Sequence, residues 1–466
     1  MKRRIIWLAV SGLMVLSLVM AACGPAAAPS APSTPAAPEG SKPAVTQNDK
    51  TPTLPVEQAG QEKEVVATSA EMVKVTLTKL DGTKMEKLME KPKYGGTLSV
   101  LGTIGEDHFN LRNMWIHLGH WVFAETLLHG DWAKGTAGTG EISWQLYEYM
   151  TMDQFMPALA QSWERPEPDT MIYHLRPGVR FAVDGREASR LVGGREVTAD
   201  DVVWNMKYHF FTEPATRAKG TYGKGVEQAD VRATDKYTVV VKAPKARLDE
   251  FLGFISDTLW VLPPEIIQKY GENYKWRNLV TTGAFMVQDF IPGSVTTFVK
   301  NPSYWANDPI LGKDYQLPYF DTFRYVDVPD KSTQMAAFRT GKLDAGLDAT
   351  RDQAGDLLRT APHLKQKIIN FGTASNRIAM QMKNPSAPWK DIRVRRALML
   401  GTDHPEIVKS FYGGAADVQA FPLPGAPELY LLGWAIPLKE LPSDVQELYE
   451  YHPDKAKQLL KEAGYP

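Results

Sequence analysis

The N-terminus assigns the chain to a compartment before anything is known of its fold. Three basic residues follow Met1 and precede an unbroken apolar run, Ile5 to Ala22, that ends directly before Cys23. A positive segment, an apolar run and small residues at its end are typical of a secretory signal peptide. We therefore predict that residues 1–22 are a signal peptide and that the folded part works outside the cytoplasm. An uncleaved signal anchor is the alternative, because the run is about long enough to span a bilayer.

Cys23 is the only cysteine among the 466 residues, so the chain forms no internal disulfide. The tetrapeptide Met20-Ala21-Ala22-Cys23 resembles the bacterial lipobox, although Met20 stands where leucine is more common. In a lipobox the cysteine thiol is acylated and the cysteine becomes the new N-terminus. The resemblance implies lipidation at Cys23 and a membrane anchor of two or more acyl chains, since a single chain binds only reversibly.

A low-complexity stretch follows the cysteine. Residues 24–58 are mostly Pro, Ala, Ser and Thr, which bury too little apolar surface to offset the entropy of ordering. We predict a Pro-stiffened tether here and assign residues 23–92 to a lipidated N-terminus and linker. The structure of residues 59–92 stays open, because their apolar residues show no dominant period: Val73, Val75, Leu77, Leu80 and Leu88.

Charge and composition exclude some partners. The chain carries 53 basic and 54 acidic residues, a formal net charge of -1 and a pI near 6.8. Such a balance argues against nucleic acid as a partner. At 43% hydrophobic residues the chain can bury a large core, and its length suggests about three domains.

Strand patterns begin near Lys93. A short run of strand formers, Thr97 to Val100, follows a glycine pair. Further on, Met171, Tyr173 and Leu175 occupy alternate positions, and Tyr237 to Val241 is a β-branched run. Both patterns predict strands.

Helices are predicted between and after these strands. Thr198 and Asp201 have the spacing of a capping box before an apolar stripe. Two further helices, over residues 332–340 and 453–463, end at Gly341 and Gly464. Strands and helices mixed without a regular alternation indicate α/β or α+β lobes.

Several blocks of sequence, in a fixed order along the chain, carry a family resemblance. They are Pro157 to Glu164, Asp169 to Phe181, Val197 to Val202, Asn301 to Trp305, Ala337 to Asp344 and Arg393 to Leu398. In this order they resemble the family 5 extracellular solute-binding proteins, which are the peptide and nickel binding subunits of ABC importers. The resemblance covers about Lys93 to Pro466.

The resemblance implies an α/β fold of the type II periplasmic-binding-protein class, with two ligand-enclosing lobes and an extra subdomain. By analogy, lobe I combines residues 93–130 and 256–370, lobe II is the insertion 131–255, and lobe III spans residues 371–466. Relatives continue past the position that corresponds to Pro466. We therefore expect a C-terminally truncated chain with an incomplete lobe III.

The resemblance also implies positions for a ligand site. The expected residues lie at the edge of the inter-lobe cleft, on lobe II and at the crossing back to lobe I: Trp115, Ile116, His117, Tyr222, Ser256, Asp257 and Thr258. One departure concerns the Gly-Thr-Gly-Pro-Tyr turn of the family, which is Thr281 to Phe285 here. It keeps Gly283 for a tight turn and lacks the proline.

Motifs of catalysis or of metal binding would indicate other functions. The chain has no Gly-x-Ser-x-Gly elbow, Walker loop or dinucleotide fingerprint. A dispersed triad stays open, but we predict no enzyme and no cofactor. Histidines cluster at four positions, His108, His117, His120 and His129. No third ligand type is fixed by spacing, so we favour structural or surface histidines over a metal site, although some relatives carry nickel.

Tryptophans crowd the start of the domain at positions 115, 121, 132 and 144. Aromatic faces suit apolar side chains or sugar rings, although core packing is the alternative for any one of them. We predict a peptide-capturing subunit that works outside the cytoplasm with ABC permease and ATPase subunits, anchored through its N-terminal lipid. An oligosaccharide binder of the same family and a surface sensing or adhesion lipoprotein are the alternatives.

Overall fold

The computed structural model describes residues 71–105, 109–111, 120–142, 154–211, 229–245, 248, 259–271, 275–366, 380–418, 433 and 436–465. The chain divides into two units, Met1–Ala67 and Thr68–Pro466, and every described residue lies in the second. Over these ranges no helix combines the length and the apolar character that crossing a membrane requires. The predicted signal peptide, Cys23 and the predicted tether of residues 24–58 lie outside the described residues.

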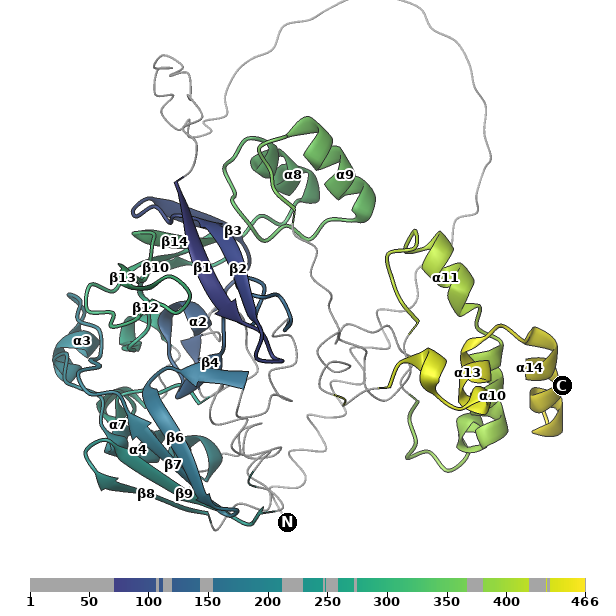
Figure 1. Cartoon of the computed structure of the whole chain (residues 1–466), viewed down its shortest axis with the longest axis horizontal. Helices are drawn as coiled ribbons and strands as arrows, with labels where there is room; N and C mark the ends of the chain where they lie inside the picture. The colour runs from purple at the N-terminus through teal and green to yellow at the C-terminus, as the bar shows by residue number, and fades with distance from the viewer. Residues whose placement is uncertain are drawn as a thin grey trace, which may run out of the picture. The chain divides into compact units, whose positions relative to one another are not determined.

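A β-hairpin precedes the part of the chain that carries the family resemblance (Figure 1). Its strands are β1 (Met72–Thr78) and β2 (Lys84–Glu90), which pair antiparallel over their whole length. Val75 and Leu77 are buried on one face of β1. The sequence left this segment open, because Lys87 interrupts the apolar alternation of the second strand.

The hairpin is fixed to a turn-rich loop of residues 131–142. The Lys87 ammonium donates to the carbonyls of Ala137 and Gly138 at 2.8 and 2.7 Å. At the hairpin turn, the backbone N–H of Leu80 donates to the Glu141 carboxylate at 3.1 Å. The lysine that breaks the apolar pattern therefore serves as a docking contact.

The two four-stranded sheets are called the lobe I and lobe II sheets, after the predicted lobes whose residue ranges contain their strands. The lobe I sheet has the strand order β10-β11-β14-β3. Its strands are β3 (Thr97–Leu101), β10 (Phe285–Ile291), β11 (Val295–Lys300) and β14 (Thr322–Val326). β3 runs parallel to β14, and the other pairs are antiparallel. The lobe I core is rich in aromatic rings, and Phe123 stacks on the fully buried Phe298 at 5.7 Å between centroids.

The lobe II sheet is antiparallel, with the order β6-β7-β9-β8. Its strands are β6 (Ala160–Glu167), β7 (Thr170–Leu175), β8 (Asp230–Asp235) and β9 (Thr238–Lys242). Met171, Tyr173 and Leu175 all point into the lobe II core, which confirms the predicted alternation. Helices α4 (Ala199–Phe210) and α7 (Pro264–Tyr270) also contribute to this core, and Figure 1 shows both beside the sheet.

Helix α4 begins where the capping box predicted. The Thr198 backbone N–H donates to the Asp201 carboxylate at 2.9 Å, so the carboxylate at the third helical position closes the first turn. The helices predicted at the end of lobe I and of the chain are also present, as α8 (Lys331–Arg339) and α14 (Pro453–Glu462). Gly341 and Gly464 follow them with φ of 65° and 88°, the left-handed conformation that favours glycine at a helix end.

The C-terminal helical segment comprises the described residues from 380 to 465. Its α-helices are α10 (Ile392–Leu400), α11 (His404–Ser410), α13 (Ser443–Gln446) and α14. The buried cluster here is small, with Ala397, Leu400 and Ala456 at the contact of α10 with α14. Short elements complete the described structure: α2 (His120–Phe123), β4 (Leu128–Gly130), β5 (Phe155–Pro157), α3 (Glu187–Val192), η4 (Trp276–Asn278), β12 (Asn307–Asp308), β13 (Gly312–Gln316), α9 (Arg351–Thr360), η5 (Pro388–Lys390), η6 (Leu438–Glu440) and η7 (Glu447–Tyr449).

Candidate functional site

The described structure brings three segments together where the lobe I and lobe II cores meet. We call these residues, 123–127, 259–262 and 280–284, the lobe junction. Neighbouring residues in each segment belong to different cores, as with Trp260 in the lobe I core and Val261 in the lobe II core. Each segment therefore contributes side chains to both cores, and we call it a crossing segment.

Backbone contacts hold the three segments against one another. The Val261 N–H donates to the Glu125 carbonyl at 3.2 Å, and the Thr281 hydroxyl donates to the Phe123 carbonyl. A Cβ atom added at Gly283 lies only 2.3 Å from the Phe123 carbonyl carbon. Gly283 is therefore required for close approach of two backbones, a reason that the sequence-based explanation of a tight turn did not include.

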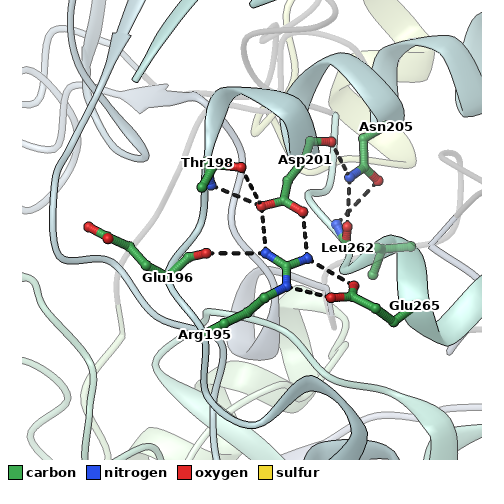
Figure 2. A network of polar contacts seen from close by, with 7 residues as sticks. All are labelled: Arg195, Glu196, Thr198, Asp201, Asn205, Leu262 and Glu265. Atoms are coloured by element: carbon green, nitrogen blue, oxygen red, sulfur yellow. Dashed lines mark hydrogen bonds and ion pairs between the residues drawn. The ribbon is translucent and has the colours of Figure 1, made fainter. Parts of the chain in front are cut away.

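A polar network connects the junction to lobe II (Figure 2). The Arg195 guanidinium lies between the carboxylates of Asp201 and Glu265, with donor–acceptor distances of 2.5 to 2.8 Å. The Asn205 side chain donates to the Leu262 carbonyl at 2.8 Å and accepts from the Leu262 N–H at 3.2 Å. Helix α4 thus fixes one crossing segment through its own side chains, while its first turn is fixed by Arg195.

A buried carboxylate lies within the junction. Glu125 is 2% exposed and accepts from the Trp305 indole N–H at 3.0 and 3.3 Å. Burial raises the pKa of Glu125 to about 7, although Thr282, Trp305, Tyr304 and the Arg176 charge each lower it in part. The carboxylate therefore changes its charge near neutral pH.

Arg176 reaches the same place from lobe II. It follows β7, and its guanidinium lies over the Trp305 ring, 4.1 Å from the ring centroid. Trp305 follows β11 of the lobe I sheet, yet it packs against the lobe II core. The stack of Arg176 on Trp305 therefore joins the two lobes beside Glu125.

Aromatic rings cluster around Trp260, a residue of the lobe junction. Trp121 contacts Trp260 edge to face at 4.9 Å and His129 at 5.3 Å. Trp121 is 41% exposed, whereas Trp260 is 3% exposed and its indole N–H has no acceptor among the described residues. Burial lowers the pKa of His129 to about 4, so this imidazole is neutral at pH 7. The cluster offers an accessible aromatic face and a buried donor.

The ligand residues named from the sequence lie outside the described residues, so the structure neither supports nor opposes them: Trp115, Ile116, His117, Tyr222, Ser256, Asp257 and Thr258. Of the four clustered histidines, His120 and His129 are described, and both take part in aromatic contacts. Within the described ranges no three His, Cys, Asp or Glu side chains are grouped to hold a metal ion.

Sequence reasoning missed Glu125 and the contact between Arg176 and Trp305. Trp305 lies within one of the blocks that carry the family resemblance. Its partner Glu125 is 180 positions away in the sequence, and its partner Arg176 lies on another lobe. The one available signal is a lone carboxylate in an apolar run, Phe123 to Leu128. Such a residue is seldom buried without partners, so it marks a polar site inside the fold.

Comparison with known proteins places this architecture in a family. The profile of the bacterial extracellular solute-binding proteins, family 5 Middle, matches residues 154–466, and the chain belongs to this family. The family is one of solute-binding proteins and not of enzymes. Its fold is α/β and of the type II periplasmic-binding-protein class.

Individual relatives are distant. Heme-binding protein A of Haemophilus influenzae is 27% identical over 334 residues, covering 66% of this chain and 54% of the relative. The oligopeptide-binding protein AppA of Bacillus subtilis is 26% identical over 400 residues, covering 83% and 63%. The chain thus spans less than two thirds of the length of these relatives.

Solved structures agree on the fold. The periplasmic binding protein DppA of Helicobacter pylori, in complex with a peptide, matches with a TM-score of 0.55 and 20% identity, over 80% of this chain and 67% of that one. AppA of Bacillus subtilis, in complex with a nonapeptide, matches with a TM-score of 0.52 and 19% identity, over 80% and 65%. At such identities the likeness concerns the fold alone.

Proposed function

We propose that this chain captures peptides outside the cytoplasm and delivers them to ABC permease and ATPase subunits for import. The observation that carries the proposal is the lobe junction, where two separately packed cores are joined by three adjacent crossing segments. Such a junction suits hinge closure around a ligand. The peptide-binding relatives supply the ligand class.

The aromatic cluster supplies a candidate contact surface beside the junction. The exposed face of Trp121 can cover an apolar side chain of the ligand. The same face suits a sugar ring, so Trp121 also favours the second candidate, an oligosaccharide binder. The cleft residues Trp115 to His117, Tyr222 and Ser256 to Thr258 remain proposed ligand contacts.

Calorimetry of the full mature protein, with Cys23→Ser to keep it in solution, tests the ligand. A pool of short peptides and a panel of β-linked oligosaccharides are titrated in parallel. Peptide binding in the micromolar range or tighter, with little side-chain preference, is expected. Sugar binding alone supports the second candidate, and binding of neither class overturns the ligand assignment.

Two equally exposed tryptophans provide a matched pair for locating the site. Trp121→Ala is expected to weaken ligand binding about tenfold, which corresponds to about 1.4 kcal/mol. Trp132 is 42% exposed and lies in the loop that holds the hairpin, so Trp132→Ala is expected to leave affinity unchanged. Equal effects of the two changes contradict a ligand contact at Trp121.

We also propose that the protein is anchored to the membrane by acylation of Cys23. The lipobox-like sequence supports this proposal. Cells that produce the protein are labelled with a radioactive fatty acid. Label in the wild-type protein and none in Cys23→Ser supports acylation at this residue, whereas equal labelling places the lipid elsewhere.

A further inference from the structure

Glu125 contacts groups from several elements that meet at the lobe junction. Its carboxylate is buried among the three crossing segments and meets the indole N–H of Trp305. The titratable groups that face it are Arg176, from the end of β7, and the phenol of Tyr304, from the turn after β11. Thr282 on the third crossing segment completes its surroundings.

These neighbours differ in how they respond to the charge of Glu125. Arg176 is held by attraction to an ionised carboxylate as well as by its stack on Trp305. The Tyr304 phenol stays neutral, because burial and the Glu125 charge raise its pKa. A protonated Glu125 keeps hydrogen bonds to its neighbours but loses the attraction to Arg176, which is the partner contributed by lobe II.

We propose that Glu125 is a positioning residue for lobe closure: its ionised carboxylate holds the Trp305 indole under the Arg176 guanidinium and thereby fixes the relative orientation of lobes I and II. Protonation of Glu125 removes its attraction to the Arg176 guanidinium and thereby widens the range of lobe orientations. The inference deepens the proposed hinge function and rests on it. It concerns the free protein, so it is testable without knowledge of the ligand.

The first measurement follows the Trp305 indole N–H by NMR in the full protein, with the signal assigned by Trp305→Phe. A wild-type signal that moves with pH, with a midpoint near 7, is expected. Glu125→Gln abolishes the movement. Arg176→Gln raises the midpoint, because removing a nearby cation disfavours the carboxylate form.

A matched control is available in Arg277, whose guanidinium lies 4.2 Å from the Trp276 ring centroid and lines a separate hollow of about 400 Å³. Arg277→Gln removes a similar stack away from Glu125 and is expected to leave the Trp305 midpoint unchanged. A wild-type signal that does not titrate, or an equal response to Arg277→Gln and Arg176→Gln, overturns the proposal.

The second measurement tests the lobes directly. Cys23→Ser gives a cysteine-free protein, and Leu191→Cys and Ile291→Cys place spin labels at exposed positions of lobe II and lobe I. The distance distribution between the labels is expected to be broader at pH 6 than at pH 8 in the wild type. In Glu125→Gln it is expected to be broad at both values.

A distribution that is independent of pH in the wild type, or equally narrow in Glu125→Gln at pH 8, overturns the positioning role. Circular dichroism confirms that each variant is folded, and Arg176→Lys, which keeps the charge and loses the planar stack, gives an intermediate width. Since no ligand is added, failure here is separate from failure to bind peptides in the calorimetry.

Discussion

Lobe II and the C-terminal helical segment differ in how their side chains are buried. Lobe II encloses a large core between its sheet and helices, and its central ion pair contains the 3% exposed carboxylate of Asp201. The described helical segment buries a small cluster of Ala397, Leu400 and Ala456. Its pair of Asp391 and Arg393 lies on the surface, with side chains 30% and 45% exposed.

The difference indicates which of the two regions is the more stable. A carboxylate and a guanidinium in a packed environment stabilise one arrangement, because removal of one partner leaves the other unpaired. Exposed pairs contribute little, and the large apolar side chain of Phe411 stays 79% exposed to water. We therefore expect the opening free energy of lobe II to exceed that of the helical segment.

The largest effect is expected from a matched pair of core leucines. Leu175 is 2% exposed in lobe II and Leu400 is 1% exposed in the helical segment, so truncation removes a similar area from each. We expect Leu175→Ala to cost about 4 kcal/mol and Leu400→Ala about 2 kcal/mol, because a loosely surrounded site relaxes into the space. Native-state hydrogen exchange measures each region separately. Equal losses of opening free energy in the two variants contradict the expected difference between lobe II and the helical segment.

The next effect concerns the ion pair of lobe II. Asp201→Ala removes one of the two carboxylates that pair with Arg195 and also removes the cap of α4, so a loss of roughly 3 kcal/mol in lobe II is expected. Asp200 is the control, because it lies in the same helical turn but is exposed. Hydrogen exchange of α4 amides compares the two variants. A loss below about 1 kcal/mol for Asp201→Ala shows that the network is dispensable.

Local sequence patterns predicted the elements whose signals lie within a few residues. The cap of α4 depends on Thr198 and Asp201, and the inward face of β7 on strict alternation, so both were predictable. The hairpin β1–β2 was not predicted, because Lys87 occupies an inward position and contacts a loop about fifty positions later. A pattern of apolar residues does not reveal such a polar docking contact.

The candidate site was less predictable than the fold. Resemblance placed ligand contacts at positions outside the described residues, so those predictions remain predictions. Glu125, Arg176 and Trp305 come together only after two cores have packed against the crossing segments. Gly283 illustrates the same limit. A side chain is excluded at this position by the backbone of Phe123, which is distant in the sequence, and not by the residues next to Gly283.

Acid sensitivity should also differ between variants of lobe II. Lys236, the Gly178 N–H and Tyr237 hold the pKa of Glu196 down to about 2, below the ordinary 4.5. A depressed pKa means that this carboxylate stabilises lobe II fully above pH 4.5 and loses that contribution as pH falls toward 2. Glu196→Gln should therefore flatten the acid dependence of lobe II opening, with a loss smaller than that of Asp201→Ala. If the opening free energy of lobe II depends on pH in Glu196→Gln as it does in the wild type, the stabilising role of the Glu196 carboxylate is contradicted.

The smallest effect is expected at the surface pair of the helical segment. Asp391 caps α10 by accepting the Arg393 N–H at 2.8 Å, and the Arg393 guanidinium also bonds the Asp391 carboxylate and the Glu462 carbonyl. Arg393→Ala is expected to change the stability of α10 least of all these variants, because water replaces most of an exposed ion pair. Asp391→Ala is expected to cost more than Arg393→Ala, because it also removes the cap. Hydrogen exchange of α10 gives both values. A cost of Arg393→Ala near that of Asp201→Ala shows that the two regions depend on their charges alike, and the contrast between them then rests on the apolar cores alone.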